Sequence, residues 1–264
     1  LGTKIASDSK IKTIPKRKSF NNIPLSFSQK RLWFINRLYP NSFAYTVTTA
    51  LNLKGKLSEH SLSKAFNTII DRHEILHTTF ISGNDGPVQR IKKENLSELK
   101  VIDLSDMPRE NRDMLCGEVI NKEAKRLFNL EQGPLFCCSL IKLENEEHIL
   151  LLVNHHIISD AWSMAVFFQE ISVCYEAFVK QAPPVLPELP IQYADYSLWQ
   201  NEWMKSRELQ EQLSYWKKQL QGAPPVLQLP LDYPRPAVQA FSGAVESIQF
   251  SSELTESLKN ISCR

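Results

Sequence analysis

Residues 149–163 read Ile-Leu-Leu-Leu-Val-Asn-His-His-Ile-Ile-Ser-Asp-Ala-Trp-Ser, and this stretch decides the fold. Its first five residues are all apolar, which is typical of a strand buried on both faces of a sheet. Residues from about 161 to 180 are predicted to form a long helix. A buried strand that leads into a helix predicts an α/β fold, and active sites favour the ends of such strands. The polar residues at this junction are therefore the first candidates for a functional site.

Further strands and helices are predicted on both sides of this stretch. Strands are expected where β-branched, aromatic and other apolar residues gather, at 43–53, 78–82, 88–91, 101–104, 135–143 and 148–153. Helices are expected from apolar periodicity and capping residues, from Ser26 or Ser28 to Leu38, from Ser58 toward Leu76, and over 108–127 and 193–220. Four prolines between positions 183 and 190 interrupt the pattern and predict a boundary between two lobes.

The last part of the sequence predicts an incomplete lobe. A Pro-rich segment at 224–236 precedes a strand candidate at 245–250 and a helix that begins near Ser251. Leu254, Leu258 and Ile261 form an apolar face on that helix, with no later element in the sequence to cover it. We therefore expect the chain to end in the middle of a domain.

Composition is that of an ordinary globular protein, with 42% hydrophobic residues and 9% aromatic ones. A formal charge of +2 is too small to indicate nucleic acid or an acidic membrane surface as a partner. Five cysteines without C-x-x-C spacing favour reduced thiols, and no apolar run approaches the roughly 20 residues of a membrane span. These features predict a cytoplasmic protein. The basic, weakly apolar residues 1–22 indicate a linker rather than a nucleic-acid-binding arm.

Adjacent histidines on an extended chain point to opposite sides, so His155 and His156 are expected to have different roles, one chemical and one structural. Asp160 lies at the start of the next helix, where its carboxylate can cap the helix or pair with a buried arginine. These residues taken alone equally allow a helix cap and a core histidine without catalysis. A metal site is disfavoured because the ligand set is incomplete, and Ser163 lacks the turn that would expose a nucleophile.

Five separate stretches, in order, give the chain a resemblance to the condensation domains of nonribosomal peptide synthetases. His155–Ser163 resembles the family's HHxxxDG motif. The other four are Leu25–Phe34 (LSFSQKRLWF), Arg72–Phe80 (RHEILHTTF), Tyr193–Trp199 (YADYSLW) and Leu229–Pro236 (LPLDYPRP). The resemblance covers residues 24–264.

The resemblance implies an α+β two-layer sandwich similar to chloramphenicol acetyltransferase. Such a lobe is the first half of a V-shaped, two-lobed domain whose histidine motif lies in a tunnel at the junction. Residues 24–182 would form the N-terminal lobe. Residues 1–23 would be a linker, and 183–264 the crossover and the incomplete start of the second lobe.

The resemblance also implies an acyltransferase-type reaction that forms an amide between two thioesters tethered to carrier proteins. His156 would act on the attacking amine as a base or would position it, and His155, Asp160, Ser163 and Arg72 would support it, with Asp160 paired to Arg72. Upstream and downstream peptidyl carrier domains and an adjacent adenylation domain would be the partners. Their phosphopantetheine arms would carry the substrates. The domain itself would bind no cofactor or metal.

Two residues depart from the family pattern. His77 replaces an arginine, which weakens or relocates the expected salt bridge, and Ala161 replaces the glycine after the motif's aspartate. Because later signatures are missing, we expect the 264 residues alone to be inactive. Both histidines argue against heterocyclisation. An epimerisation-type relative and a non-catalytic module that docks carriers or tailoring enzymes stay as alternatives.

Overall fold

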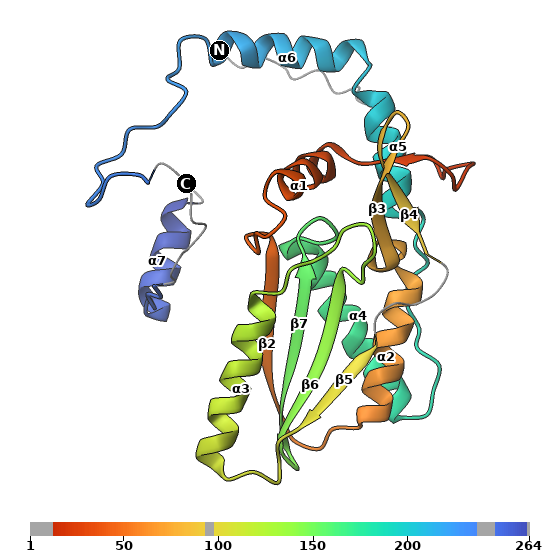
Figure 1. Cartoon of the computed structure of the whole chain (residues 1–264), viewed down its shortest axis with the longest axis vertical. Coiled ribbons are helices and arrows are strands. Elements are labelled where there is room, and N and C mark those ends of the chain that lie inside the picture. The colour runs from red at the N-terminus through yellow and green to blue at the C-terminus, as the bar shows by residue number, and fades with distance from the viewer. Residues whose placement is uncertain (1–12, 93–97, 237–245, 263–264) are drawn as a thin grey trace. The chain divides into compact units, whose positions relative to one another are not determined.

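The computed structural model describes residues 13–92, 98–236 and 246–262. Its described elements form two compact units, of which the first extends to Ala223 and the second begins at Pro224. The first unit contains two sheets (Figure 1). The larger sheet has the strand order β2-β7-β6-β5, and the smaller has the order β1-β4-β3. This mixed α/β architecture confirms the predicted fold class.

The larger sheet is built around the strand with which the sequence analysis began. This strand, β7 (Glu147–His155), pairs antiparallel with β2 (Thr46–Lys54) and with β6 (Phe136–Glu144), while β5 (Leu99–Asp103) runs parallel to β6. Leu151 and Leu152 are completely buried. A central strand with neighbours on both edges and cover on both faces explains the uninterrupted apolar run.

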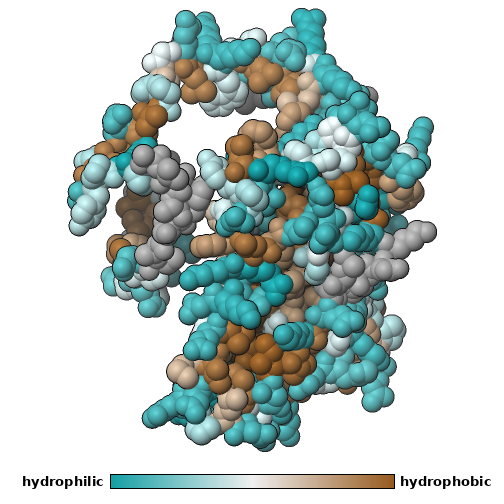
Figure 2. Space-filling model, viewed as in Figure 1, coloured by the Kyte–Doolittle hydropathy of each residue, from teal (hydrophilic) through white to brown (hydrophobic). Residues whose placement is uncertain are grey.

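Two helices, α2 (Glu59–Arg72) and α4 (Ala161–Val179), pack against each other and on one face of the large sheet. Phe136 of β6 lies between them, with its ring centroid 5.7 Å from that of Phe66 and 5.2 Å from that of Phe167. Helix α3 (Arg109–Ala124) contacts β2 and β7. Figure 2 shows one group of hydrophobic residues over the sheet and α3.

The smaller sheet comprises β1 (Ile23–Pro24), β4 (Gly86–Ile91) and β3 (Thr78–Gly83). It adjoins the short 3-10 helix η1 (Glu74–His77) and α5 (Tyr193–Trp203), and α5 also contacts α1 (Phe27–Leu38). The hairpin between β3 and β4 turns at Gly86, whose φ of +122° favours glycine.

Local capping signals placed several helix starts correctly. Ser26, rather than Ser28, caps α1 in a capping box with Gln29, and Ser58 caps α2. The helix predicted over 193–220 is instead two helices, because Ser206 accepts a hydrogen bond from the Leu209 amide and starts α6 (Arg207–Gln219). Because this side chain bonds to the backbone in place of a helical partner, the continuous helix is interrupted there and a new one begins.

The second unit contains one helix, α7 (Ser252–Ser262), among its described residues. The strand predicted at 245–250 is absent from the described residues 246–250, and Val245 lies outside them. The lobe boundary predicted near residue 183 stays a prediction. Helix α5, which follows that boundary in sequence, packs against β1, η1 and α1 of the first unit.

Candidate active site

The two histidines lie on opposite sides of the backbone where β7 ends. In the sheet register Phe136 is opposite Asn154, so Asn154 faces α4 and the next residue, His155, faces away from it. His155 is 4% exposed, whereas His156 is exposed and lines a cavity of about 190 Å³. The predicted divergence of the two rings is therefore confirmed.

His155 is built into the core. Its Nδ1 accepts a hydrogen bond from the Ile157 amide at 3.0 Å, and Phe128 presents its ring edge to the imidazole with the centroids 6.1 Å apart. Burial, with a smaller effect from the neighbouring charge on His156, lowers the pKa of His155 to about 4. A neutral ring that accepts at Nδ1 carries its proton on Nε2. His155 thus shapes the loop that presents His156.

Asp160 and Ser163 form a reciprocal cap at the start of α4. The Asp160 carboxylate accepts from the Ser163 amide at 2.8 Å and from its hydroxyl at 2.7 Å, while the Asp160 amide faces the Ser163 hydroxyl at 3.4 Å. Hydrogen bonds from the Ser163 hydroxyl and amide, with a smaller effect from His156, lower the pKa of the Asp160 carboxyl. The predicted cap is confirmed, and it occupies the Ser163 hydroxyl.

The cavity at His156 is enclosed by elements distant in sequence. The His156 amide donates to the Tyr45 carbonyl at 2.8 Å, which fixes the backbone just beyond β7. Gln29 of α1 reaches the Ile157 carbonyl at 3.4 Å. Ile75 of η1 and Tyr193 of α5 complete the wall, and the Tyr193 hydroxyl lies 2.9 Å from the Ser26 hydroxyl. Three sequence signatures therefore meet at one histidine.

A second cavity of about 240 Å³ shares part of this wall, including Ile75, Ser163 and Tyr193. It is lined mainly by apolar side chains, among them Phe167 and Ile191. Trp162, directly after the capped start of α4, lines it and is 81% exposed. His156 thus lines a cavity with both polar and apolar walls, and this cavity adjoins a mainly apolar one.

Arg72 does not form the ion pair with Asp160 that the resemblance implied. Its Nε donates to the two carboxylate oxygens of Glu170 at 3.3 and 3.2 Å, and its Nη2 donates to the Pro187 carbonyl. Glu170 is ten residues after Asp160 on one helix, a separation of about 15 Å at 1.5 Å per residue. The end of α2 therefore faces the middle of α4, and Arg72 joins the two helices there.

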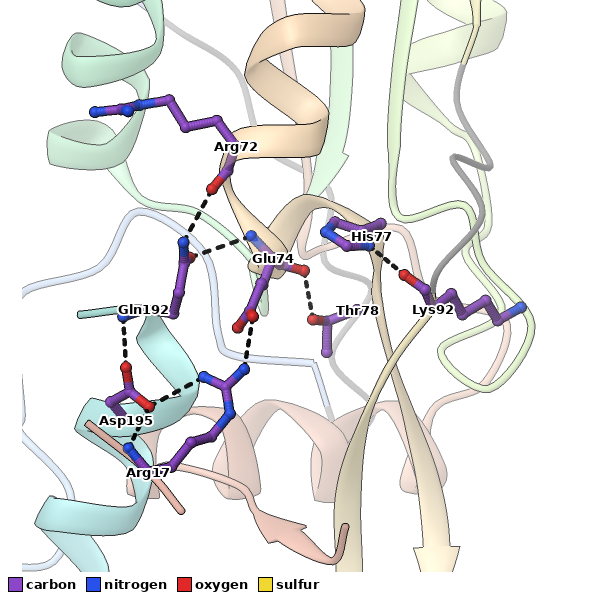
Figure 3. Close-up of polar contacts among 8 residues, drawn as sticks. All are labelled: Arg17, Arg72, Glu74, His77, Thr78, Lys92, Gln192 and Asp195. Atoms are coloured by element: carbon purple, nitrogen blue, oxygen red, sulfur yellow. Dashed lines mark hydrogen bonds and ion pairs between the residues drawn. The ribbon is translucent and has the colours of Figure 1, made fainter. Parts of the chain in front are cut away.

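The two departures from the family pattern also have definite places. His77 directs its Nδ1 to the Lys92 carbonyl (Figure 3), and its buried Nε2 has no partner within the described residues. Ala161 is the first residue of α4, directly after its cap.

Sequence reasoning missed two buried charged residues near this site. Glu170 accepts from both Arg72 and His73, whose Nε2 lies 2.6 Å from a Glu170 oxygen. Arg17, assigned to the linker, has a side chain only 4% exposed that pairs with Glu74 and Asp195. For Glu170 the available signal was its position on the apolar face of a helix, where a buried charge needs a partner.

The described part of the chain contains no cluster of three or more His, Cys, Asp or Glu side chains able to hold a metal ion. No described helix is long and apolar enough to cross a membrane. Cys116, Cys137, Cys138 and Cys174 are free thiols, and burial raises the pKa of each.

The family model described as "Condensation domain" matches residues 20–263. One of the linear gramicidin synthase proteins of Brevibacillus parabrevis is 44% identical over 97% of this chain, which spans 5% of that relative. Phosphinothricin tripeptide synthetase PhsC of Streptomyces viridochromogenes is 34% identical over 95% of the chain, which spans 23% of it. This chain is therefore similar to a small part of each of two large peptide synthetases.

Solved structures are similar to this chain as well. The starter condensation domain of rhizomide synthetase RzmA has a TM-score of 0.70 and 23% identity over 76% of this chain and 48% of its own, which shows the fold. The structure titled "Complex of the X-domain and OxyB from Teicoplanin Biosynthesis" has a TM-score of 0.74 and 27% identity over 86% of this chain and 49% of its own.

Proposed function

Because this chain belongs to the condensation-domain family of nonribosomal peptide synthetases, we propose that its site at His156 forms an amide bond between two carrier-tethered thioesters. The observation that carries the proposal is the exposure of His156 in a cavity, beside a buried and neutral His155. Condensation domains are acyltransferase-type enzymes without a cofactor of their own. The substrates would arrive on the phosphopantetheine arms of an upstream and a downstream carrier domain.

In the proposed reaction, the amine of the downstream aminoacyl group attacks the carbonyl carbon of the upstream thioester. The new C–N bond forms and the C–S bond breaks, so the acyl group moves to the downstream carrier and the upstream thiol leaves. The nitrogen loses one proton and the departing sulfur gains one. His156 is the group beside this nitrogen, and histidine is the side chain that most often transfers a proton in enzyme reactions.

The neighbours of His156 support this role by holding its backbone in place. Its backbone is fixed by the Tyr45 carbonyl, and the loop behind it is fixed by Gln29 and by His155. A positioned base contributes about 10²–10⁴-fold to a rate, and orientation of the two tethered substrates contributes more. Asp160 and Ser163 hold the start of α4 and would not touch the reacting atoms.

The test uses the full natural protein with both carriers loaded. His156→Ala should lower the rate of amide formation by about 10²–10⁴-fold. His60→Ala is the matched control, because His60 is an exposed histidine in the first turn of α2 and lines neither cavity at the motif. An unchanged rate in His156→Ala would refute the proposed chemistry.

A second candidate is a docking module that binds a partner enzyme or carrier without catalysing a reaction. The similarity to an X-domain seen in complex with OxyB favours it, because that structure covers 86% of this chain. The two candidates differ in what His156 does. A docking module would bind loaded carriers with the same affinity in wild-type protein and His156→Ala, and neither would form the amide.

A further inference from the structure

The N-terminal segment predicted as a linker contributes a buried cation to the first unit. The Arg17 side chain is 4% exposed, although its neighbour Lys16 is 65% exposed. Arg17 Nη1 donates to Asp195 Oδ1 at 3.0 Å and Nη2 donates to Glu74 Oε1 at 2.6 Å (Figure 3). The Arg17 amide also donates to Asp195 Oδ1 at 3.0 Å. Both the backbone and the side chain of Arg17 are therefore fixed.

The two carboxylates belong to different elements that meet at Gln192. Asp195 lies in the first turn of α5 and accepts from the Gln192 amide at 2.8 Å. The Gln192 side chain accepts from the Glu74 amide at 3.2 Å and donates to the Arg72 carbonyl at 2.9 Å. Arg17 thus joins three segments, the N-terminal segment, η1 and the start of α5. We call Arg17, Glu74, Gln192 and Asp195 the Arg17 clamp.

Charge and burial make this clamp depend on Arg17. The Asp195 side chain is 4% exposed and the Glu74 side chain 23%, so each carboxylate has lost much of its water. Burial would raise the pKa of the Asp195 carboxyl, but hydrogen bonds from the Gln192 amide and the Arg17 amide and guanidinium outweigh it and lower that pKa. Without Arg17, two anions would lie near each other with no cation between them.

Both elements held by the clamp supply walls of the histidine cavity. Ile75 follows Glu74 directly on η1, and Tyr193 follows Gln192 directly on α5. Tyr193 also meets the Ser26 cap of α1, whose Gln29 holds the carbonyl of Ile157 next to His156. A displacement of α5 at Asp195 would therefore move a cavity wall and loosen a support of the catalytic loop.

We propose that Arg17 is a positioning residue for the reaction at His156, because its ion pairs to Asp195 and Glu74 fix Tyr193 and Ile75 in the wall of the histidine cavity. This inference rests on the proposed function. It makes part of the N-terminal segment, which was predicted to be a linker, a supporting part of the active site, with the chain fixed at residue 17.

The experiment compares Arg17→Ala, Arg17→Lys and the control Lys16→Ala in the full natural protein. Lys16 is the matched control because its ion pair with Glu188 is solvent-exposed, at 65% and 90%. Two quantities are measured, namely kcat and KM for amide formation from loaded carriers, and hydrogen exchange of peptides covering 72–77 and 190–196. Exchange reports the clamp without any need for turnover.

Arg17→Ala should lower kcat at least tenfold, leave KM within about twofold, and speed exchange in both peptides. Arg17→Lys keeps the charge but loses the fork that reaches two carboxylates, so it should lower kcat about threefold. Lys16→Ala should match wild type in both measurements. If Arg17→Ala does not fold, Arg17→Lys carries the test.

Wild-type kcat in Arg17→Ala, or in Arg17→Lys if only that variant folds, would overturn the positioning role. Unchanged exchange in both peptides would also overturn it, because the walls would then not depend on Arg17. A wild-type protein that forms no amide would refute the proposed function, and the positioning role with it. Failure of the inference alone is therefore recognised by an active wild type and an equally active variant.

Discussion

Replacing Glu170 by glutamine should destabilise the first unit far more than the same change at Glu176, although both residues lie on α4. Glu170 is buried, and its carboxylate contacts the Arg72 Nε at 3.2 and 3.3 Å and the His73 Nε2 at 2.6 Å. Glu176 pairs with Lys180 at 2.5 Å, and both side chains are about two-thirds exposed. The two variants remove the same charge from different surroundings.

The magnitude follows from burial. Removing one partner of a fully buried ion pair costs about 3–5 kcal/mol, because the other charge is left without compensation. The Arg72 and Glu170 side chains retain 17% and 11% exposure, so partial hydration brings the expected loss to about 2–3 kcal/mol. The exposed pair of Glu176 and Lys180 contributes far less, because water screens both charges.

Chemical and thermal unfolding of the chain, followed by circular dichroism, checks this difference. For 150–250 residues, each kcal/mol corresponds to about 2–4 °C in Tm, so Glu170→Gln should lower Tm by about 5–10 °C. Glu176→Gln should change Tm by less than about 2 °C. Equal unfolding free energies for the two variants would refute the assignment of Glu170 as the buried partner of Arg72.

Three further predictions each concern a single residue. In NMR titrations His155 should change charge near pH 4. Because this folded pKa lies below the unfolded value of about 6.5, the neutral ring contributes about 3 kcal/mol of folding stability that is fully present above pH 6.5 and is lost as the pH falls toward 4. A titration midpoint above pH 6 would contradict this prediction. Asp160→Ala should lower the free energy of unfolding in urea by about 1 kcal/mol at pH 7 and by less at pH 3. The carboxyl pKa is lowered in the folded state, so the stability contributed by the Asp160 carboxylate falls as the pH falls. Asp160→Asn should retain most of the cap. Phe136→Ala should cost about 3–5 kcal/mol in the same assay, and a cost no larger than that of Val185→Ala, at a site 85% exposed, would contradict its central place between Phe66 and Phe167.

Features that depend on neighbours in sequence were predictable. Ser26, Ser58 and Asp160 cap helices because each accepts from an amide three residues ahead, a contact that needs no knowledge of the rest of the chain. The divergence of His155 and His156 follows from the alternation of a strand.

Features that depend on distant partners were not predictable. The sequence offers Arg72 several carboxylates, and only the packing of α2 on α4 selects Glu170 over Asp160. Arg17 carries no local sign of burial, because its partners Glu74 and Asp195 lie 57 and 178 residues away. The division of 193–220 into two helices depends on one serine, Ser206, whose cap competes with continuation of α5.

The register of β7 makes the order of the two histidines a matter of parity. His155 is the last paired residue of that strand, opposite Thr46, and His156 is the first residue beyond it. Deleting one residue within β7, with the start of the strand kept in its pairing, would place the second imidazole at the buried position opposite Thr46 and the first at the buried position of Asn154, opposite Phe136. The chain therefore distinguishes two identical side chains by odd and even positions along one strand.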